Sequence, residues 1–275
     1  MVIEDNLEVL VSTMHRSSLD FIDKMFLKVE MSKINILIIN QTTDKNILTS
    51  NQPNIRVINA FDTGLSKSRN LALANAKSKY ILIADDDLVY EGNFYKTILD
   101  TFKNYQDAAL ITFEAYDDSG SPMRFYPEKS SKHDYKSISK VSSIEIAFNL
   151  ETIKKLNVSF NEYFGLGSTF QTGEEQIFAR AVFKHQPCYF VKQKIVQHPY
   201  FTSGREGGSD RLLYARAAIF YKKNGALSYL KLIHYVFLIL KKDEISWNQV
   251  IPKLKMGLKG ISNYKALVKQ GFETR

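Results

Sequence analysis

Three consecutive aspartates, Asp85, Asp86 and Asp87, are the side chains best suited to chemistry in this chain. They follow the apolar run Tyr80–Ala84, which predicts a buried strand, and ligands of open α/β sheets bind beyond such strand ends. Adjacent carboxylates repel one another, so Mg²⁺ or Mn²⁺, shared with substrate phosphates, would stabilise them. Extended backbone would point Asp85 and Asp87 to one side and Asp86 to the other. Taken alone, the run suits an acidic helix cap equally well.

A second polar segment, DTGLSKSRN over residues 62–70, comes one predicted strand earlier. Gly64 predicts a turn, and Ser66 fits the N-cap of the helix that follows. Backbone N–H groups at this helix start, with the cations Lys67 and Arg69, would receive an anion. The same residues also suit an ordinary capped helix, and the segment alone leaves both interpretations open.

Two acids and two later residues complete the candidate set. Glu174 and Glu175 begin a predicted helix, where carboxylates either act as a general base or complement the helix dipole. His198 follows a predicted strand and either completes the shell of an oxygen-bound metal or has a structural role. Arg205 lies in the glycine-rich segment 202–209, which suits a loop that closes over a departing phosphate or a plain linker.

Short apolar runs alternate with helical patterns through the first two-thirds of the chain. This alternation predicts an α/β fold with a largely parallel sheet flanked by helices, then a C-terminal helical extension. We expect a catalytic domain over residues 1–205 and a helical region over residues 206–275. The predicted strands are residues 7–12, 34–39, 55–58, 80–84, 108–115, 144–149 and 189–196. The predicted helices are residues 18–30, 66–76, 91–105 and 174–184, with a run of helices after residue 210.

Three blocks in this order resemble the family 2 glycosyltransferases. The first is GLSKSRNLALANAKSKYILIADDDL from Gly64 to Leu88, and the others span Phe160–Gly167 and Gly173–Phe178. The resemblance covers roughly residues 7–200, and the ordered set is more specific than any one motif. It implies a Rossmann-like GT-A fold and an inverting transfer of sugar from a nucleotide-diphosphate donor.

The resemblance also implies roles for the acids. Asp85 is expected near the nucleoside and, with Asp87, on the metal, while Asp86 fits either role. Glu175 matches the second acid of the family's Glu-Asp motif, the usual catalytic base, and Glu174 is its neighbour. Many GT-A enzymes carry a late histidine on the metal, which implies that role for His198.

The residues expected to contact the nucleotide differ from the family pattern in two places. After the first strand, Thr13, Met14 and His15 stand where a Pro-Thr-Tyr-like stretch is usual, and Thr13 and His15 are expected near the nucleotide. The second strand normally delivers an acid toward the base, and here Asp44 is the acid that follows it.

Composition and charge limit the kinds of partner that this protein can have. Cys188 is the single cysteine, which excludes a disulfide framework and a multi-thiolate zinc site. From Arg205 to Arg275, 14 Lys and Arg stand against 5 Asp and Glu, although the whole chain carries a net charge of +8. Because these cations lie among apolar stretches such as 227–240, we expect peripheral contact with an anionic membrane and no nucleic-acid partner. A solvated helical face remains the alternative.

The first six residues do not suit a secretory signal, so we expect a cytoplasmic protein at the inner face of the plasma membrane. The resemblance makes UDP-hexose the expected donor. A lipid-linked saccharide is the expected acceptor, in synthesis of a bacterial surface polysaccharide of the capsule or O-antigen type.

Two other functions are alternatives to sugar transfer. A metal-dependent nucleotidyltransferase would usually have a glycine-rich loop after strand one, which Ser12–Arg16 lacks. A non-catalytic membrane-surface binding protein would not need intact acids in both motifs.

Overall fold

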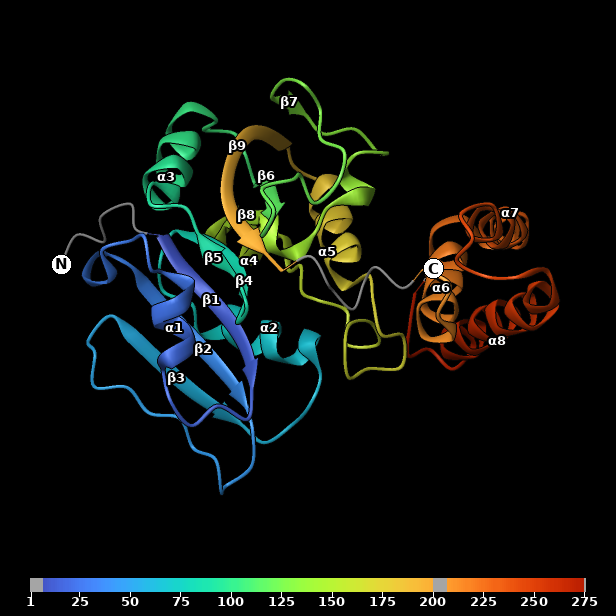
Figure 1. Ribbon diagram of the computed structural model, residues 1–275, viewed down its shortest axis with the longest axis horizontal. Coiled ribbons are helices and arrows are strands. Elements are labelled where there is room, and N and C mark those ends of the chain that lie inside the picture. The colour runs from blue at the N-terminus through green and yellow to red at the C-terminus, as the bar shows by residue number, and fades with distance from the viewer. Residues whose placement is uncertain (1–6, 200–206, 275) are drawn as a thin grey trace. The chain divides into compact units, whose positions relative to one another are not determined.

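The computed structural model describes residues 7–199 and 207–274, which form two compact units (Figure 1). The first unit comprises residues 1–161 and 175–200, and the second comprises residues 162–174 and 201–275. Each unit has its own apolar core, so each is described by itself. Within the described ranges, no helix combines the length and the apolar character that crossing a membrane requires.

A sheet of nine strands forms the centre of the first unit, as far as the described residues extend. Its order is β3-β2-β1-β4-β8-β6-β9-β5, with β7 beside β9. The bounds are β1 Leu7–Met14, β2 Asn35–Gln41, β3 Ile55–Ala60, β4 Tyr80–Asp85, β5 Val89–Tyr90, β6 Leu110–Asp117, β7 Ser131–Lys132, β8 Ile146–Asn149 and β9 Cys188–His198.

The expected parallel arrangement holds for the run from β3 to β4 and for the pair β6–β9. It is wrong for β8, which runs antiparallel to both of its neighbours, β4 and β6. β5 and β7 also pair with β9 in the antiparallel sense. The sheet is therefore mixed, because residues 118–145 return the chain to the sheet in the opposite direction without a helical crossover.

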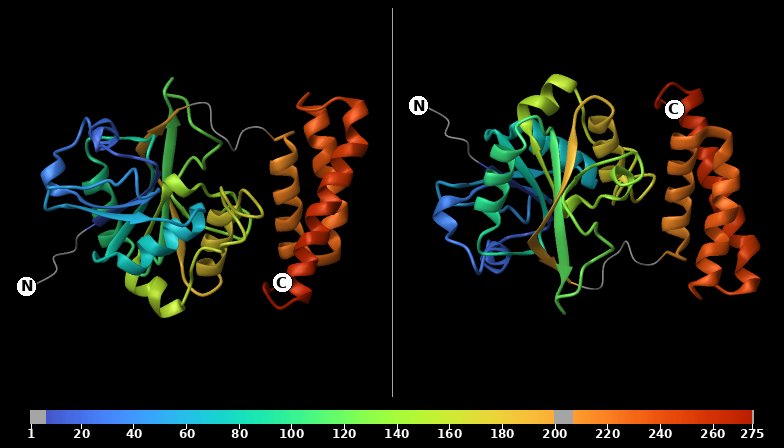
Figure 2. Two further views of the ribbon diagram at one scale, coloured as in Figure 1. Left: turned by 90° about the horizontal axis from the view of Figure 1, so that it is seen from below. Right: turned by 90° about the horizontal axis from the view of Figure 1, so that it is seen from above.

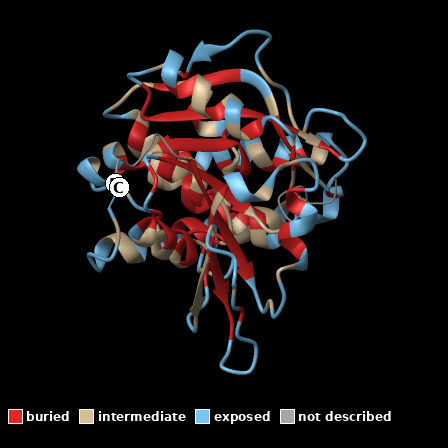
Figure 3. Cartoon of the chain, turned by 90° about the vertical axis from the view of Figure 1, so that its left-hand side faces the viewer, coloured by how far each residue is buried: buried red, intermediate tan, exposed pale blue. Residues whose placement is uncertain are grey.

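Helices cover both faces of this sheet, and the alternation of side chains along the strands explains why. Leu7, Val9 and Val11 share one apolar core with α1 (Asp20–Met25) and α3 (Phe94–Asn104). Alternate strand residues, such as Leu10, face the opposite core. That core includes α2 (Leu65–Asn75), α4 (Leu150–Leu156) and α5 (Glu174–Phe183). Apolar side chains point both ways, so the strands are buried almost throughout, as the red strands of Figure 3 show.

Three helices make up most of the second unit: α6 (Asp210–Asn224), α7 (Ser228–Lys241) and α8 (Val250–Lys269). They run side by side, as both views in Figure 2 show. Gly260 lets α8 approach α6 closely, because a Cβ at that position would lie 2.2 Å from the carbonyl oxygen of Tyr214. Phe170, from the loop 162–174, stacks on Tyr214 with ring centroids 5.3 Å apart. The loop is thus part of the core of this unit.

Candidate functional site

The candidate site lies in the first unit, at the carboxyl edge shared by β1 and β4. Their parallel register sets Ser12 opposite Asp85, so the loop after β1 and the aspartate run leave the sheet side by side. The backbone turns at Asp86 and Asp87, although extended backbone was expected there. The expected two-sided alternation is therefore wrong, and each aspartate meets a different partner.

Asp85 is paired with Arg69 from the first turns of α2. The guanidinium nitrogen lies 2.9 Å from the carboxylate oxygen, and the Arg69 side chain is only 3% exposed. α2 starts at Leu65 with Gly64 as its N-cap residue, so the expected cap at Ser66 is wrong by two residues. Gly64 adopts a φ of 125°, a conformation that glycine tolerates best. Arg69, which was expected to receive an anion, thus pairs with a carboxylate of the chain itself.

Asp86 is held by Arg16, a residue that the motifs did not single out. The carboxylate oxygen Oδ2 accepts hydrogen bonds from Nε and Nη2 of Arg16 at 2.9 and 2.7 Å. The same oxygen accepts one from the hydroxyl of Thr13 at 2.5 Å. The sequence held one signal for Arg16, namely a cation directly after the first strand. Because β1 lies beside β4, this cation comes close to the aspartates. Thr13 therefore lies at the site, as expected, with its hydroxyl bound to Asp86.

Asp87 faces His198 at the end of β9. The imidazole Nε2 lies 3.5 Å from a carboxylate oxygen. The two residues come together because Val89, just after Asp87, pairs with Gln197, just before His198. Burial raises the pKa of the Asp87 carboxyl, the imidazole lowers it, and the charges of Asp85 and its neighbour raise it further. A nearby cation stabilises a carboxylate whose pKa is shifted upward. Asp87, with His198 beside it, is therefore the aspartate of the three that could best hold a metal ion.

The donor atoms fit a divalent cation that relies on further ligands from a substrate. Asp87 offers carboxylate oxygen and His198 offers nitrogen, both accepted by Mn²⁺ and Mg²⁺. Asp85 and Asp86 are already paired with arginines. In the ranges 7–199 and 207–274, no three His, Cys, Asp or Glu side chains are close enough to hold a metal unaided. Two protein ligands plus phosphate and water are the arrangement that this site allows.

A cavity of about 380 Å³ opens beside Asp86 and Asp87 on the side of α1. Its walls combine the cations of Arg16 and Lys24 with the two carboxylates. The remaining lining residues are Ser18, Asp20, Phe21, Leu88 and Val89. With Asp20 the lining holds three carboxylates and two cations, so the cavity suits a polar ligand better than an apolar one.

Of the other residues expected on the nucleotide side, Lys67 is partly exposed, and His15 and Asp44 are exposed. Lys67 forms an ion pair of 2.6 Å with Asp62, so an anion would have to displace that partner. His15 is exposed after β1 with a φ of 54°, and its backbone N–H donates to the carbonyl of Gln41. Asp44 stands in an exposed turn after β2. Arg205 falls in residues 200–206, outside the described part of the chain.

A chain of contacts links α5, which carries the predicted base, to α2. The side-chain amide of Asn70 bonds both backbone groups of Phe160, at 2.9 and 2.8 Å. The ring of Phe160 stacks on Phe178 of α5 with centroids 4.3 Å apart. At the start of α5, Glu174 is 5% exposed, whereas Glu175 is half-buried and accepts a hydrogen bond from Gln176 at 3.4 Å. Of the two acids, Glu175 is the more accessible.

The family of the chain follows from sequence comparison. The chain belongs to glycosyl transferase family 2, whose family model matches residues 9–164. No curated protein matches the sequence significantly.

Solved structures show which fold this is. Residues 1–349 of S. aureus TarS match over 98% of this chain and 93% of that one, with a TM-score of 0.56 and 12% identity. The same TarS fragment in complex with UDP-GlcNAc matches over 97% and 92%, with a TM-score of 0.57 and 11% identity. At such low identity the likeness concerns the fold alone, and it confirms the GT-A fold that the motifs predicted.

Replacement of Arg69 by methionine tests the buried pair. Loss of the guanidinium leaves Asp85 beside two other carboxylates, so we expect the free energy of unfolding to fall by about 2 kcal/mol or more. Lys67→Met is the matched control on the same helix, because its ion pair is exposed and little stability depends on such pairs. Urea unfolding of both variants decides the matter. Equal midpoints would contradict a stabilising role of the Arg69–Asp85 pair.

Proposed function

We propose that this protein is an inverting glycosyltransferase that moves a sugar from a nucleotide-diphosphate donor, UDP-hexose, to a saccharide acceptor. The observation that carries the proposal is the set of three aspartates at the end of β4, each with its own partner: Arg69, Arg16 and His198. Membership of glycosyl transferase family 2 supports sugar transfer. TarS, which shares the fold, is known in complexes with UDP-GlcNAc and with UDP, which supports a uridine-diphosphate donor.

Asp87 and His198 are the proposed ligands of Mn²⁺ or Mg²⁺, with Asp85 nearby. When bound, the ion supplies positive charge that stabilises the diphosphate as it leaves. Arg16 and Arg69 prepare the site, because they neutralise Asp86 and Asp85 and thereby lower the repulsion on Asp87.

Thr13, His15 and Asp44 lie at or just beyond the ends of β1 and β2, at the same edge of the sheet as the aspartates. We assign the nucleoside to the region of Thr13, His15, Asp44 and Asp85. The diphosphate is assigned to the start of α2, with Gly64 and Lys67, and to Arg205. Lys67 would exchange Asp62 for phosphate, since an exposed ion pair is readily replaced.

Glu175 is the proposed base. It takes the proton from the acceptor hydroxyl while that oxygen attacks the anomeric carbon, and the bond to the diphosphate breaks with its electron pair leaving on phosphate. Glu174 is buried and is assigned a supporting role. The attack from the face opposite the diphosphate inverts the configuration at the anomeric carbon.

The outer face of α7 is the proposed contact with membrane. Leu230, Ile233 and Phe237 recur at helical spacing and are 66%, 44% and 47% exposed. Trp247, the single tryptophan, is 75% exposed and meets Phe237 edge-on with centroids 6.5 Å apart. Exposed cations at Lys231, Lys241 and Lys242 flank these side chains.

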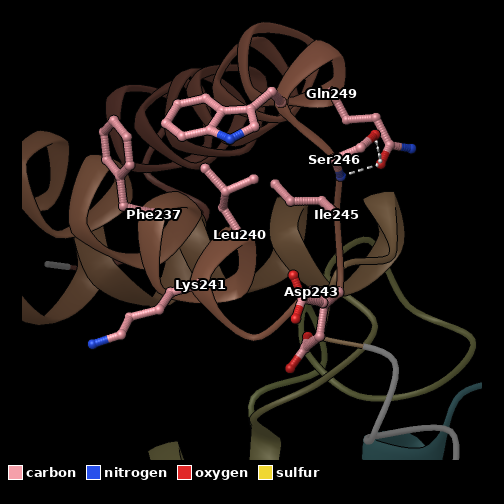
Figure 4. A pocket seen from close by; sticks show the side chains of 9 residues that line it. Phe237, Leu240, Lys241, Asp243, Ile245, Ser246 and Gln249 are labelled. Atoms are coloured by element: carbon pink, nitrogen blue, oxygen red, sulfur yellow. Dashed lines mark hydrogen bonds between the residues drawn. The ribbon is translucent and has the colours of Figure 1, made fainter.

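A groove of about 940 Å³ continues this face between the end of α7 and the start of α8 (Figure 4). Leu240 and Ile245 point into it, and Phe237 stands at one side. An apolar surface with tryptophan and flanking lysines suits the boundary of an anionic bilayer. This supports a lipid-linked acceptor at the inner face of the plasma membrane, in surface polysaccharide synthesis of the capsule or O-antigen type.

A screen of nucleotide sugars with Mn²⁺ tests the donor and the metal. We expect release of nucleoside diphosphate from a UDP-hexose, abolished by EDTA and restored by excess Mn²⁺. Asp87→Asn should bind Mn²⁺ more weakly in calorimetry, whereas Glu151→Asn, an exposed acid on α4, should leave binding unchanged. Release that survives chelation would contradict the metal assignment.

Replacement of Glu175 by glutamine tests the base. The amide keeps the shape of the side chain but cannot accept the proton, so sugar transfer should fall roughly a hundredfold or more. Binding of UDP should be unchanged in calorimetry. Glu151→Gln is the control for loss of one carboxylate. Transfer at the wild-type rate by Glu175→Gln would contradict the assignment.

Liposome co-sedimentation tests the membrane contact. Leu230→Asp should lower the fraction bound to vesicles that contain phosphatidylglycerol, because a charge on an inserting face opposes its burial in lipid. Leu27→Asp, an equally exposed leucine in the first unit, should bind as the wild type does. Equal binding by both variants, or no binding by the wild type, would count against the α7 surface.

A further inference from the structure

Two asparagines lie opposite each other in the parallel strands β2 and β3, close to where these strands end. Asn40 of β2 is 0% exposed, and its register partner in β3 is the half-buried Asn59. Asparagine is depleted in strands, and the residue before each of the two is an isoleucine. Burial of an amide is costly unless the amide is hydrogen-bonded. The hydrogen bonds of these two side chains therefore indicate what they contribute.

Asn40 holds the backbone of Arg16, the residue that pairs with Asp86. Its Oδ1 accepts a hydrogen bond from the N–H of Arg16 at 3.0 Å, and its Nδ2 donates to the carbonyl of Arg16 at 2.9 Å. His15, the preceding residue, turns the chain with a φ of 54°, and its N–H donates to the carbonyl of Gln41 at 2.9 Å. The end of β2 thus fixes the turn from which Arg16 reaches Asp86.

Asn59 holds the loop after β2 in the same way. Its Nδ2 donates to the carbonyl of Leu48 at 2.9 Å, and its Oδ1 accepts from the N–H of Leu48 at 3.0 Å. Leu48 is 1% exposed and lies beyond the exposed Asp44 in this loop. Nearer the strand, the hydroxyl of Thr42 donates to the carbonyl of Asn46 at 2.7 Å. The loop around Asp44 is therefore held on both sides.

The two asparagines are also bonded to each other, because Nδ2 of Asn40 donates to Oδ1 of Asn59 at 3.0 Å. The backbone at both ends determines how the amides are oriented. The N–H of Leu48 requires an oxygen from Asn59, and that same oxygen accepts from Asn40. The other face of Asn40 then offers its oxygen to the N–H of Arg16. This asparagine pair, Asn40 and Asn59, thus links the loop after β1 to the loop after β2.

We propose that the asparagine pair positions the nucleoside half of the donor site. This role rests on the proposed function, which assigns the nucleoside to the region of His15, Asp44 and Asp85. The pair holds two loops of that region, the turn at His15 and the loop around Asp44. Loops that are fixed before the donor binds lose less conformational entropy on binding. Asn40 is buried with both polar atoms bonded within the chain, so it acts through these loops and not by contact with the donor.

Calorimetry with UDP and Mn²⁺ tests the asparagine pair in the full-length chain. Asn40→Ala and Asn59→Ala should each raise the Kd for UDP roughly tenfold, about what one or two net hydrogen bonds contribute. The double variant should lose less than the sum of the two effects, because residues of one hydrogen-bond network are coupled.

Asn54→Ala is the matched control. The Nδ2 of Asn54 donates to the carbonyls of Met31 and Ile34, both at 2.8 Å, just before β2 and β3 begin at the opposite edge of the sheet. Its replacement removes the same kind of bond, so it should lower the urea midpoint of unfolding comparably. The Kd for UDP should stay at the wild-type value.

Steady-state kinetics adds a measurement that a merely structural role would not change. The donor KM of Asn40→Ala should rise, while kcat at saturating donor stays near wild type. A lower kcat with an unchanged donor KM would overturn the proposal, as would an equal loss of UDP affinity in Asn54→Ala. If the buried Asn40→Ala does not fold, the half-buried Asn59→Ala decides, and a wild-type Kd in that variant overturns the proposal.

The wild type separates this role from the proposed function. A wild type that binds no UDP contradicts the UDP donor of the proposed function, and the role of the asparagine pair falls with it. A wild type that binds UDP, together with folded pair variants that bind it equally well, overturns the role of the asparagine pair alone.

Discussion

The repulsion among three adjacent carboxylates is the constraint on which the rest of the site depends. Asp85, Asp86 and Asp87 are consecutive at the end of β4, and their negative charges repel one another, the more so because Asp85 and Asp86 are half-buried. The fold resolves it by bringing a different partner to each carboxylate from a different element. Arg69 comes from α2, Arg16 from the loop after β1, and His198 from the end of β9.

The order of the sheet is what brings these partners to the aspartates. β1 must lie beside β4 for Arg16 to reach Asp86, and the parallel register of the two strands provides this. β9 must lie beside β5 for His198 to face Asp87, and here the pairing is antiparallel. The parallel half of the sheet thus supplies the two arginines that neutralise the aspartates. The mixed half supplies the histidine that faces Asp87.

The buried ion pairs of the first unit divide into two kinds. Glu8 and Arg56 pair at 2.6 Å near the amino ends of the strands, far along the sheet from the aspartates, and Glu8 also accepts from the N–H of Lys77. This network closes the start of β4 and has a structural role. Arg69–Asp85 lies at the carboxyl edge, beside the aspartates to which the proposed function assigns donor binding. Position in the fold, more than residue type, distinguishes the two.

Local patterns in the sequence determined the longer strands of the first unit, most of the helices between them and the place of the aspartates at a strand end, but not the short strands β5 and β7 or the helix α4. Short apolar runs rich in β-branched residues favour buried strands, and the family motifs supplied the GT-A fold. The reversed direction of β8, the turn at Asp86 and the pairs Arg16–Asp86 and Arg124–Glu145 were decided by tertiary structure alone. The partners in the first of these pairs are 70 residues apart, and those in the second are 21 apart. Charge pairing over such separations depends on which strands become neighbours, and no local pattern records that choice.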